Sequence, residues 1–426
     1  MQAEIVFIGT ELLLGQIANS NAVFLGRELA SLGIDCFYQT VVGDNKTRIK
    51  ECLRTALERA DLIITTGGLG PTPDDLTTEC WAELFNEEMV FDQDILKKVE
   101  SVFAKANKKM SASNRKLVYR PKTAEQLPNN VGSAPGIIWD VTEHCKRLQI
   151  VGKEKKLVMT FPGVPREMEG MWKETAIPYL SNLLGENKKL FYKELKFFGI
   201  SESRLAEKVK DTLNLEDPTV APLVSLGECR LRIASKSQDA KEAQKKIKGV
   251  EEQITKTVGE FIYGYDEDTL ESVVGSLLKT KNKTLSLAES CTGGLISQRL
   301  TNVPGSSSYI SLNVTTYSNE SKKQILNVSQ DTLEKYGAVS EQVALQMAKG
   351  IKNLAKTDYA LSVTGIAGPS GGTIEKPNGT VYIAIIDEED KEFIRKLELG
   401  NRSRNDIRWA SSQEALNLVR QKLLGI

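Results

Sequence analysis

The C-terminal third of the chain contains the stretch Glu289-Ser290-Cys291-Thr292-Gly293-Gly294, which directly follows the apolar run Thr284–Leu287. This pattern predicts a short buried strand that breaks into a turn of small residues and reopens as a helix at 296–301. Unpaired backbone N–H groups at the start of a helix favour developing negative charge. A hydroxyl at such a turn is a candidate nucleophile. The stretch therefore predicts an α/β domain with a reactive Ser290 at a strand-to-helix turn.

The residue that would activate this serine is not a nearby histidine. The whole chain contains one histidine, His144, which lies far away in the sequence and in a polar stretch of a different predicted domain. The general base is therefore expected to be a lysine or a carboxylate.

Composition excludes several classes of protein. The 426 residues include 56 basic and 56 acidic side chains, so no overall field favours nucleic acid or an anionic membrane. No stretch approaches the ~18 apolar residues of a membrane-spanning helix, and the N-terminus does not resemble a signal peptide. Six scattered cysteines without a C-x-x-C pair indicate a reducing compartment and no structural zinc site. We expect a cytoplasmic, multidomain protein.

The order of predicted elements gives the fold class as α/β, with two α/β sandwich domains joined by a small α+β unit. Strands and helices alternate in the first domain, which is typical of a parallel sheet. The small unit has the order β-α-β-β-α, and a linker is expected near Leu184–Lys189. The predicted domains are residues 1–184, 189–258 and 262–426.

A glycine-rich loop follows a strand in the first domain, with the sequence Thr65-Thr66-Gly67-Gly68-Leu69-Gly70 and then Pro71-Thr72-Pro73-Asp74-Asp75. Glycines let the backbone approach a phosphate, and a helix predicted to begin near Asp75 would complete an anion cradle. The carboxylates of Asp74, Asp75 and Glu79 would repel that phosphate unless a divalent cation lay between them. The loop therefore predicts a metal-bridged phosphate ester. The alternative is a connector in which Asp75 only caps a helix.

Three stretches of the third domain meet at one sheet edge if its sheet is parallel, because the carboxyl ends of parallel strands share an edge. They are the Ser290 turn, the stretch 316–322 and the glycine-rich loop 364–372. Lys322 could then lie near Ser290 and, if desolvated, act as the general base. Arg404 and Arg408, four residues apart at a helix start, could hold a phosphate at the same edge.

Each of these assignments has a structural alternative. Ser290 could be only a helix cap, and a lysine at a helix start is usually solvated. Cys291 adjoins Ser290, and a lysine can activate a thiol as well. Tyr317, which lies in the stretch 316–322, could be a core aromatic residue with its hydroxyl in water.

The glycine-rich loop of the first domain, residues 67–77, has the pattern Gly-Gly-x-Gly-x-x-x-x-Asp-x-Thr. This pattern resembles the molybdopterin-binding domains of molybdenum-cofactor synthesis. Two more motifs, one running from Gly9-Thr10-Glu11-Leu12-Leu13 to Asn21 and the other Pro162-Gly163-Val164-Pro165, narrow the resemblance to the competence/damage-inducible protein family, CinA. It covers essentially the whole chain. The resemblance implies an ADP-ribose pyrophosphatase in the first domain that depends on a divalent metal such as magnesium and on potassium. It implies phosphate binding by Gly67, Gly68 and Gly70, and a metal held by Glu11, Asp44 and Asp75.

The third domain is similar to the nicotinamide-nucleotide amidases of this family, which deamidate nicotinamide mononucleotide without a cofactor. That resemblance implies Ser290 as nucleophile, Lys322 as base and Tyr317 as an assisting hydroxyl. The other residues expected to contact the substrate or its oxyanion are Thr292, Gly293, Gly294, Gly365, Gly368, Arg404 and Arg408. The usual Gly-Asp-Arg before the last helix reads Gly400-Asn401-Arg402 here, so either Arg402 or Arg404 would bind the phosphate.

The middle segment is similar to the K-homology-like unit of the family but has only isolated glycines, at 199, 227 and 249. Without a Gly-x-x-Gly clamp, nucleic-acid binding is not expected, and this segment is instead expected to join two protomers into a homodimer.

The two implied substrates, nicotinamide mononucleotide and ADP-ribose, both arise when NAD is consumed. We therefore expect a pyridine-nucleotide salvage enzyme that contacts no membrane. The alternative is a non-catalytic pterin- or nucleotide-binding protein related to competence.

Overall fold

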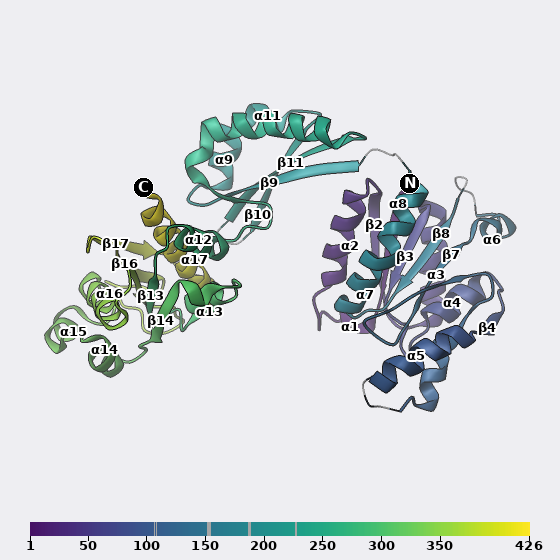
Figure 1. Cartoon of the computed structure of the whole chain (residues 1–426), viewed down its shortest axis with the longest axis horizontal. Coiled ribbons are helices and arrows are strands. Elements are labelled where there is room, and N and C mark those ends of the chain that lie inside the picture. The colour runs from purple at the N-terminus through teal and green to yellow at the C-terminus, as the bar shows by residue number, and fades with distance from the viewer. Residues whose placement is uncertain (106, 108, 151–154, 186–188, 226–227) are drawn as a thin grey trace. The chain divides into compact units, whose positions relative to one another are not determined.

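The computed structural model describes residues 1–105, 107, 109–150, 155–185, 189–225 and 228–426. The chain forms two compact units, which we call unit 1 (Met1–Phe191 with Lys236–Gln244) and unit 2 (Tyr192–Ser235 with Lys245–Ile426) (Figure 1). Part of the expected linker, residues 186–188, lies outside the described residues. Within the described ranges, no helix is both long enough and apolar enough to cross a lipid bilayer.

Unit 1 is built on a six-stranded sheet in the order β2-β1-β3-β8-β7-β6. The four strands from β2 to β8 run parallel, and β7 and β6 continue the sheet in antiparallel fashion. Their bounds are β1 (Gln2–Ile8), β2 (Asp35–Val42), β3 (Leu62–Thr66), β6 (Glu125–Leu127), β7 (Gly136–Asp140) and β8 (Leu157–Phe161). A separate antiparallel pair joins β4 (Met89–Phe91) and β5 (Tyr119–Pro121).

Helices connect the strands of unit 1. Their bounds are α1 (Thr10–Leu13), α2 (Ser20–Ser31), α3 (Lys46–Arg59), α4 (Thr77–Leu84), α5 (Gln93–Lys105), the 3-10 helix η1 (Ala112–Val118), α6 (Thr142–Arg147), α7 (Pro165–Met171) and α8 (Ile177–Leu184), with a π-helical turn, Trp172–Ala176, between the last two. Helix α4 begins at Thr77, close to the start predicted near Asp75.

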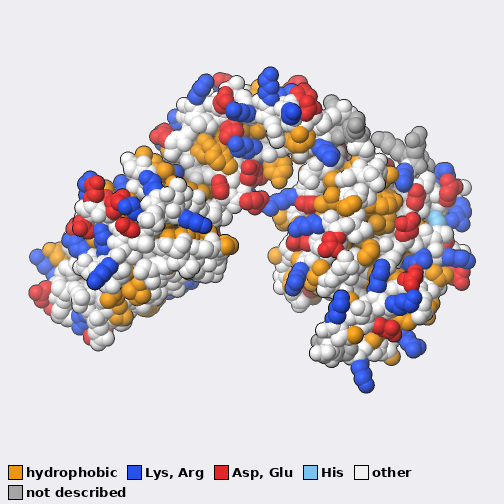
Figure 2. Space-filling view, in the orientation of Figure 1, with side chains coloured by type: hydrophobic (Ala, Val, Ile, Leu, Met, Phe, Trp, Pro, Cys, Tyr) orange, Lys and Arg blue, Asp and Glu red, His pale blue; other side chains and the backbone are white. Residues whose placement is uncertain are grey.

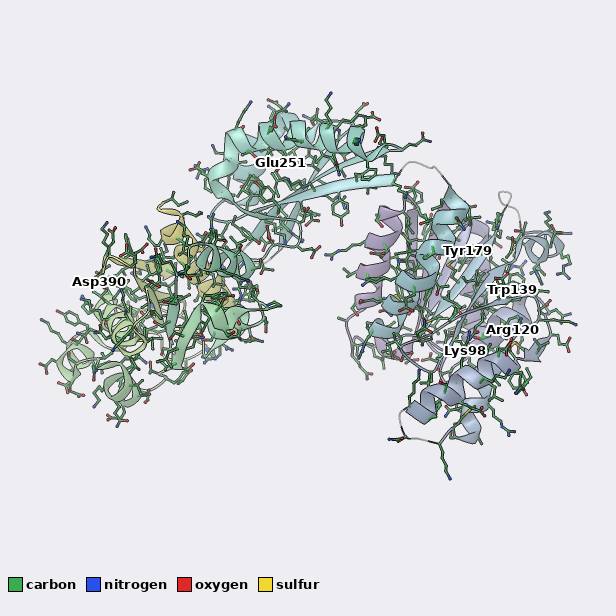
Figure 3. The ribbon with its side chains drawn as sticks, in the orientation of Figure 1. Lys98, Arg120, Trp139, Tyr179, Glu251 and Asp390 are labelled. Carbon is green, nitrogen blue, oxygen red and sulfur yellow. The ribbon has the colours of Figure 1, made fainter. Side chains whose placement is uncertain are left out.

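Both faces of this sheet are buried, because successive side chains of a strand point to opposite faces. Ile5 and Phe7 of β1 pack in the cluster that also holds residues of α2, α7 and α8, whereas Val6 and Ile8 pack with residues of α3, α4 and α6. Figure 1 shows these two helical layers on either side of the sheet. Trp139, labelled in Figure 3, belongs to the second cluster.

The middle segment forms a four-stranded sheet in the order β10-β11-β9-β12. Its elements are β9 (Lys189–Phe197), α9 (Glu202–Lys208), α10 (Lys210–Leu213), β10 (Thr219–Ser225), β11 (Glu228–Ser237), α11 (Ala240–Val258), a 3-10 turn (Gly259–Phe261) and β12 (Ile262–Tyr265). Val209 separates the two short helices α9 and α10.

The rest of unit 2 is built on a five-stranded sheet in the order β14-β13-β15-β16-β17. Strand β13 is parallel to β14 and β15, and β16 and β17 are antiparallel additions. A fully parallel sheet is therefore excluded, but the three strands that lead into the predicted site are parallel. The strands are β13 (Leu285–Glu289), β14 (Ile310–Thr315), β15 (Tyr359–Gly365), β16 (Thr380–Ile386) and β17 (Glu392–Glu398).

Helices cover both faces of this second sheet. Their bounds are α12 (Leu270–Thr280), α13 (Leu295–Thr301), α14 (Asn319–Leu326), α15 (Gln330–Tyr336), α16 (Glu341–Ala355) and α17 (Arg404–Leu424), with a 3-10 turn at Ser306–Ser308. One hydrophobic cluster joins the sheet to α12, α13 and α17, and two others join it to α14, α15 and α16. The expected α/β class, with two sandwich domains and a smaller α+β unit, is confirmed.

Charged side chains of both signs are interspersed over the face drawn in Figure 2. This distribution agrees with the equal numbers of basic and acidic residues.

Candidate active site

Ser290 lies directly after the C-terminal end of β13, where the chain turns toward α13. Its backbone N–H donates to the carbonyl of Val363 in β15 at 2.9 Å, so the sheet still holds this residue. The turn that follows contains Gly293 and Gly294 with φ angles of +60° and +89°, which residues with a side chain rarely adopt. Ser290 is 8% exposed. Its hydroxyl is therefore held in place at the edge of the sheet.

Lys322 lies on helix α14, which follows the strand next to β13 in the sheet, and its side chain reaches Ser290 from there. Strand β14 lies beside β13 and leads into α14, whose start is capped by Ser318. The Nζ atom of Lys322 lies 3.0 Å from Ser290 Oγ and 2.7 Å from the carbonyl oxygen of Thr316. Lys322 is only 1% exposed, so it is not the solvated lysine that its position at a helix start would suggest.

Burial lowers the pKa of Lys322 from its ordinary value of 10.5 to about 8. The cause is desolvation, which penalises the charged ammonium form more than the neutral amine. The Thr316 carbonyl can only accept a hydrogen bond, so it binds one N–H of Lys322 in either form. The lone pair of the neutral amine is then available to accept the proton of the Ser290 hydroxyl.

Cys291 lies next to Ser290, but its environment disfavours a thiolate. The side chain is buried, and desolvation raises the pKa of its thiol to about 12. Since the thiolate is the reactive form of cysteine, this side chain is poorly suited to attack at neutral pH. The geometry therefore favours serine over cysteine at this turn.

The carboxylate of Glu289 binds the backbone N–H groups at the N-terminus of α13. This corrects the expectation that these N–H groups are unpaired and available to a developing negative charge. The buried carboxylate of Glu289 accepts hydrogen bonds from the N–H groups of Gly294, Ile296 and Ser297 at 3.0, 3.2 and 2.8 Å. The N–H of Gly293 donates to the Ser290 carbonyl at 3.0 Å. The N–H groups of Gly293 and Gly294 are thus engaged within the turn, which leaves those of Cys291 and Thr292 as candidate donors to an oxyanion.

The two arginines of α17 reach the same edge. Arg404 donates from Nη1 to the Gly368 carbonyl and from Nη2 to the Tyr317 hydroxyl, each at 2.7 Å. Arg408 donates from Nε and Nη2 to the Thr292 carbonyl at 3.1 and 2.8 Å. Among the ion pairs found in the described residues, neither arginine has a carboxylate partner.

The surroundings of Tyr317 exclude its structural alternative, and those of Gly365 give this glycine a packing role. Tyr317 is 61% exposed and is therefore not a core aromatic residue. A Cβ atom on Gly365 would lie 2.8 Å from the Thr380 carbonyl, so this glycine permits close packing of β15 on β16. Gly368, in contrast, contributes its carbonyl to the arginine contact at the edge.

In unit 1 the glycine loop borders a cavity of about 610 Å³. Gly67, Gly68 and Gly70 all line it, together with Glu11, Asp44 and Asp75. Gly67 has φ +102°, and a Cβ atom there would lie 2.0 Å from the Ile8 carbonyl, so only glycine fits this approach to β1.

The three predicted metal ligands surround this cavity without forming a cluster. Asp44 Oδ2 accepts from the N–H and hydroxyl of Thr10 at 2.8 Å each. Asp75 Oδ2 accepts from the N–H of Thr72 at 2.8 Å and also from its hydroxyl, so Asp75 closes its own turn and does not cap α4. No group of three ligating side chains close enough to hold a metal is found among the described residues.

This donor set fits a magnesium ion only with further ligands. Asp44 and Asp75 each keep one carboxylate oxygen that is free of the threonine contacts, and Glu11 lines the same cavity. Magnesium commonly binds through one or two carboxylates, several waters and the phosphates of a substrate.

Sequence reasoning missed several contacts that shape the two sites. Glu79 does not line the phosphate cavity, because its carboxylate pairs with Lys116 at 3.2 Å and lines a second cavity. Asn21 is buried, donates to the Thr66 hydroxyl and the Gly163 carbonyl, and ties two cavity loops together. The only sequence signal for Asn21 is its place in the motif that begins at Gly9.

His144 makes structural contacts within unit 1. It is buried, its Nε2 lies 3.1 Å from Glu87 Oε2, and its ring packs edge-on against Phe85 and Trp139. The histidine is thus part of a core rather than of a polar surface stretch.

Comparison with known proteins finds three family descriptions that match consecutive segments. They are a probable molybdopterin binding domain over residues 4–182, a damage-inducible protein CinA KH domain over 192–264 and a CinA C-terminal domain over 267–423.

Full-length relatives and a partial structural match are also found. A CinA-like protein of Crocosphaera subtropica is 47% identical over 424 residues, covering 100% of both chains. A CinA-like protein of Gloeothece citriformis is 48% identical over 426 residues, covering 100% of this chain and 99% of its own. A crystal structure of a competence/damage inducible protein from Agrobacterium tumefaciens is 37% identical over 37% of this chain and 97% of its own, with a TM-score of 0.35.

Proposed function

The chain belongs to the CinA family, and on that premise we propose that unit 2 is a nicotinamide-nucleotide amidase that works through Ser290 and Lys322. One observation carries this proposal: the Nζ atom of a buried lysine lies 3.0 Å from the Oγ atom of a serine at a strand-to-helix turn. A nucleophile and a base within hydrogen-bond distance are the minimum machinery for acyl transfer without histidine or metal.

The reaction follows from this pair. Neutral Lys322 accepts the Ser290 proton while Oγ attacks the carbonyl carbon of the nicotinamide carboxamide, which gives a tetrahedral oxyanion. The C–N bond then breaks, the ammonium of Lys322 returns its proton to the leaving nitrogen, and ammonia departs from an acyl ester on Ser290. Water, deprotonated by Lys322, hydrolyses this ester to nicotinate mononucleotide. The N–H groups of Cys291 and Thr292 are the candidate donors to the oxyanion.

The phosphate of the substrate would be held by the arginines of α17. A guanidinium without a carboxylate partner is available to a phosphate dianion. Arg404 and Arg408 both donate hydrogen bonds to backbone carbonyls at the sheet edge where Ser290 lies. Arg404, rather than Arg402, makes these contacts. Tyr317, bonded to Arg404, is proposed to assist in positioning the substrate.

Ammonia release from nicotinamide mononucleotide by the purified chain tests the amidase proposal directly. We expect stoichiometric formation of ammonia and nicotinate mononucleotide in the presence of a chelator, since no step needs a metal. Binding of the nucleotide without turnover would instead support the non-catalytic alternative.

The pH dependence of this reaction should report Lys322. Because the pKa of Lys322 is lowered to about 8, kcat should rise with pH through about 8 and level off above it as the amine loses its proton. The rate is best measured from pH 7 to 10, where the substrate phosphate, with a second pKa of about 6, stays doubly charged. A rate that falls or stays constant over this range would exclude a lysine base.

A second activity is proposed for unit 1, namely divalent-metal-dependent hydrolysis of nucleotide pyrophosphates such as ADP-ribose. The supporting observation is one cavity lined by three glycines of a loop and by five carboxylates, among them Glu11, Asp44 and Asp75. When bound, the metal would offset the charge between these carboxylates and the phosphates. Potassium dependence is carried over from the family resemblance alone.

The remaining expectations are retained as proposals. We propose the domain limits 1–184, 189–258 and 262–426. Homodimerisation, the absence of nucleic-acid and membrane partners, the absence of a cofactor in the amidase, and a cytoplasmic location rest on the sequence arguments above.

A further inference from the structure

Glu289 is a buried charge that takes no part in the proton transfers proposed for the amidase. It is the last residue of β13, is 1% exposed and directly precedes Ser290. Its Oε2 accepts from the N–H groups of Gly294 and Ile296 at 3.0 and 3.2 Å, and its Oε1 accepts from the N–H and the hydroxyl of Ser297 at 2.8 and 2.6 Å. A buried carboxylate is costly unless its lone pairs are satisfied. These four donors at the start of α13 therefore hold the side chain in one position.

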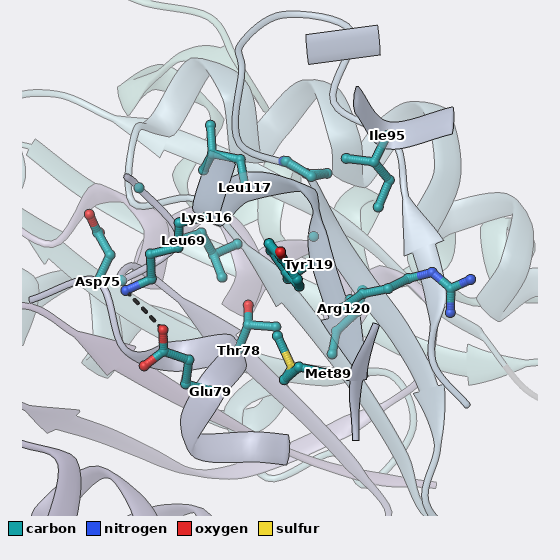
Figure 4. Close-up of a pocket in the computed structure, with 15 residues that line it drawn as sticks. Leu69, Asp75, Thr78, Glu79, Met89, Ile95, Lys116, Leu117, Tyr119 and Arg120 are labelled. Atoms are coloured by element: carbon teal, nitrogen blue, oxygen red, sulfur yellow. Dashed lines mark ion pairs between the residues drawn. The ribbon is translucent and has the colours of Figure 1, made fainter. Parts of the chain in front are cut away.

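An acidic residue near a helix start does not by itself constrain a turn, as Glu79 of unit 1 shows. Glu79 lies in the first turn of α4 and pairs with Lys116 Nζ at 3.2 Å, the ion pair that is drawn as a dashed line in Figure 4. Its side chain is 37% exposed, so water and a lysine share its charge. Glu289 differs because it belongs to the strand before its helix and binds the helix across the turn between them. The hydrogen bonds of Glu289 therefore fix the shape of the turn 290–294.

That turn needs a contact of this kind, because two of its residues are glycines. Gly293 and Gly294 have φ angles of +60° and +89°, which glycine adopts about as readily as negative values. The glycines thus permit the observed turn but do not select it. Glu289 selects it, and the turn in its turn sets the directions of the N–H groups of Cys291 and Thr292.

The carboxylate acts on the backbone rather than on the proton-transfer pair. Lys322 Nζ has its hydrogen bonds to Ser290 Oγ and to the Thr316 carbonyl, and neither is a contact with Glu289. Desolvation, rather than a neighbouring carboxylate, lowers the pKa of Lys322. Removing the charge of Glu289 should therefore leave the basicity of the lysine unchanged.

We propose that Glu289 is the positioning residue of the amidase, which fixes the turn so that the N–H groups of Cys291 and Thr292 meet the oxyanion. The proposal rests on the amidase function proposed for unit 2. The same contact has a second consequence, since the start of a helix is an anion site. With Glu289 bound there, the phosphate of the substrate is left to the arginines of α17.

Glu289→Ala removes the carboxylate and leaves its four donors unpaired. We expect kcat for nicotinamide mononucleotide to fall at least about 10²-fold, the usual cost of losing one oxyanion donor. Calorimetric affinity for the nucleotide should change by less than about threefold, because the loss is confined to the transition state. The midpoint of the pH profile of kcat should stay at the parent's value of about 8, since Lys322 is untouched.

Formate should restore activity to Glu289→Ala, because it brings a planar carboxylate into the vacated space. We expect a saturable recovery of at least about tenfold, which corresponds to about 1.4 kcal/mol of transition-state stabilisation. Formamide, which has the same shape without the charge, should give no recovery. Glu289→Gln keeps the test decisive if the alanine variant does not fold. Its amide nitrogen faces N–H donors in place of an oxygen, so it should lose kcat in the same way and, with the space filled, should not respond to formate.

Glu271→Gln is the matched control for a general loss of stability. Glu271 is a carboxylate that also binds α13, but through the side chain of Arg299 at 2.7 Å rather than at the start of the helix. Its replacement should lower Tm and leave kcat and the pH profile unchanged. A loss of kcat in Glu271→Gln as large as that in Glu289→Ala would mean that any weakening of the contacts of α13 has the same effect, and the positioning role would be wrong.

A small alkyl fluorophosphonate tests the turn without nicotinamide mononucleotide. Ser290 Oγ bonds to phosphorus, the P–F bond breaks with release of fluoride, and Lys322 takes the hydroxyl proton. The phosphoryl oxygen then lies where the oxyanion would form. Mass spectrometry gives the rate of labelling, which Glu289→Ala should lower and formate should restore.

The two assays separate the possible outcomes. If the parent chain is labelled at Ser290 but releases no ammonia, the amidase proposal fails and the labelling rates alone decide the role of Glu289. If ammonia is released and the Glu289 variants keep both rates, the positioning role fails and the amidase stands. Recovery with formamide equal to that with formate, no recovery with formate, or a shifted pH midpoint in Glu289→Ala would also contradict positioning. A parent chain that is neither labelled nor active overturns both proposals.

Discussion

Ser290→Ala is expected to release ammonia from nicotinamide mononucleotide at least about 10³-fold more slowly than the parent chain, with little change in nucleotide affinity. The hydroxyl is the atom that forms the acyl ester, and it is the group that Lys322 Nζ contacts at 3.0 Å. Steady-state ammonia assays give kcat, and calorimetric titration gives the affinity. The loss should appear in kcat because Ser290 contributes to the transition state rather than to phosphate binding.

Lys322→Met is expected to be equally inactive without being less stable. The pKa of Lys322 is about 8 in the folded chain against 10.5 ordinarily, so the folded state binds this proton more weakly than the unfolded state. At pH 7 the buried ammonium therefore destabilises the fold by about 3 kcal/mol, a cost that is lost as pH rises from 8 to 10.5. Replacing it with a neutral side chain of similar length should leave Tm unchanged or higher. A large fall in Tm would mean that Lys322 acts in folding rather than in proton transfer.

Cys291→Ala is the matched control for both variants. Its thiol is buried with a raised pKa, so its removal should cost kcat only a few-fold through local packing. An inactive Cys291→Ala variant beside an active Ser290→Ala variant would contradict the serine mechanism and favour a lysine-activated thiol.

Local pattern is enough to predict which elements meet at this site. Parallel strands share their carboxyl edge, so the run before Ser290 and the strand before Lys322 can be placed together from spacing alone. The role of Glu289 cannot be predicted in the same way. A carboxylate at the last position of a buried strand gives no local sign of whether it turns back onto the next helix, because that choice depends on the dihedral angles of two glycines.

Unit 1 is harder to predict where contacts are long-range. The strand β8, Leu157–Phe161, is a fully buried run that lies between β3 and β7 in the sheet. A short apolar run does not reveal its partners. Sequence distance groups Glu79 with the phosphate loop, whereas the partner that neutralises it, Lys116, lies on η1. Pairing of this kind is a property of the folded chain and is not encoded in local periodicity.

Asp75→Asn is expected to lower ADP-ribose hydrolysis by at least about 10²-fold while leaving deamidation by unit 2 unchanged. Asparagine keeps the shape of the side chain and an oxygen that can accept from Thr72, so the turn should persist. What it removes is the charge that would hold a divalent cation against the phosphates. A chelator should produce the same loss in the parent chain, and added magnesium should restore the parent but not the variant.

Glu83→Gln separates this effect from a general loss of negative charge on the loop and on α4. Glu83 is a carboxylate of α4, but it pairs with Lys50 at 3.1 Å and lines neither cavity. Its removal should leave hydrolysis intact. If Asp75→Asn and Glu83→Gln lower the rate equally, the effect is electrostatic and diffuse, and Asp75 is not a metal ligand. If the parent chain hydrolyses ADP-ribose at the same rate with and without a chelator, the carboxylates of this cavity serve the turn at Thr72 and the contact at Thr10, and a metal has no part in the reaction.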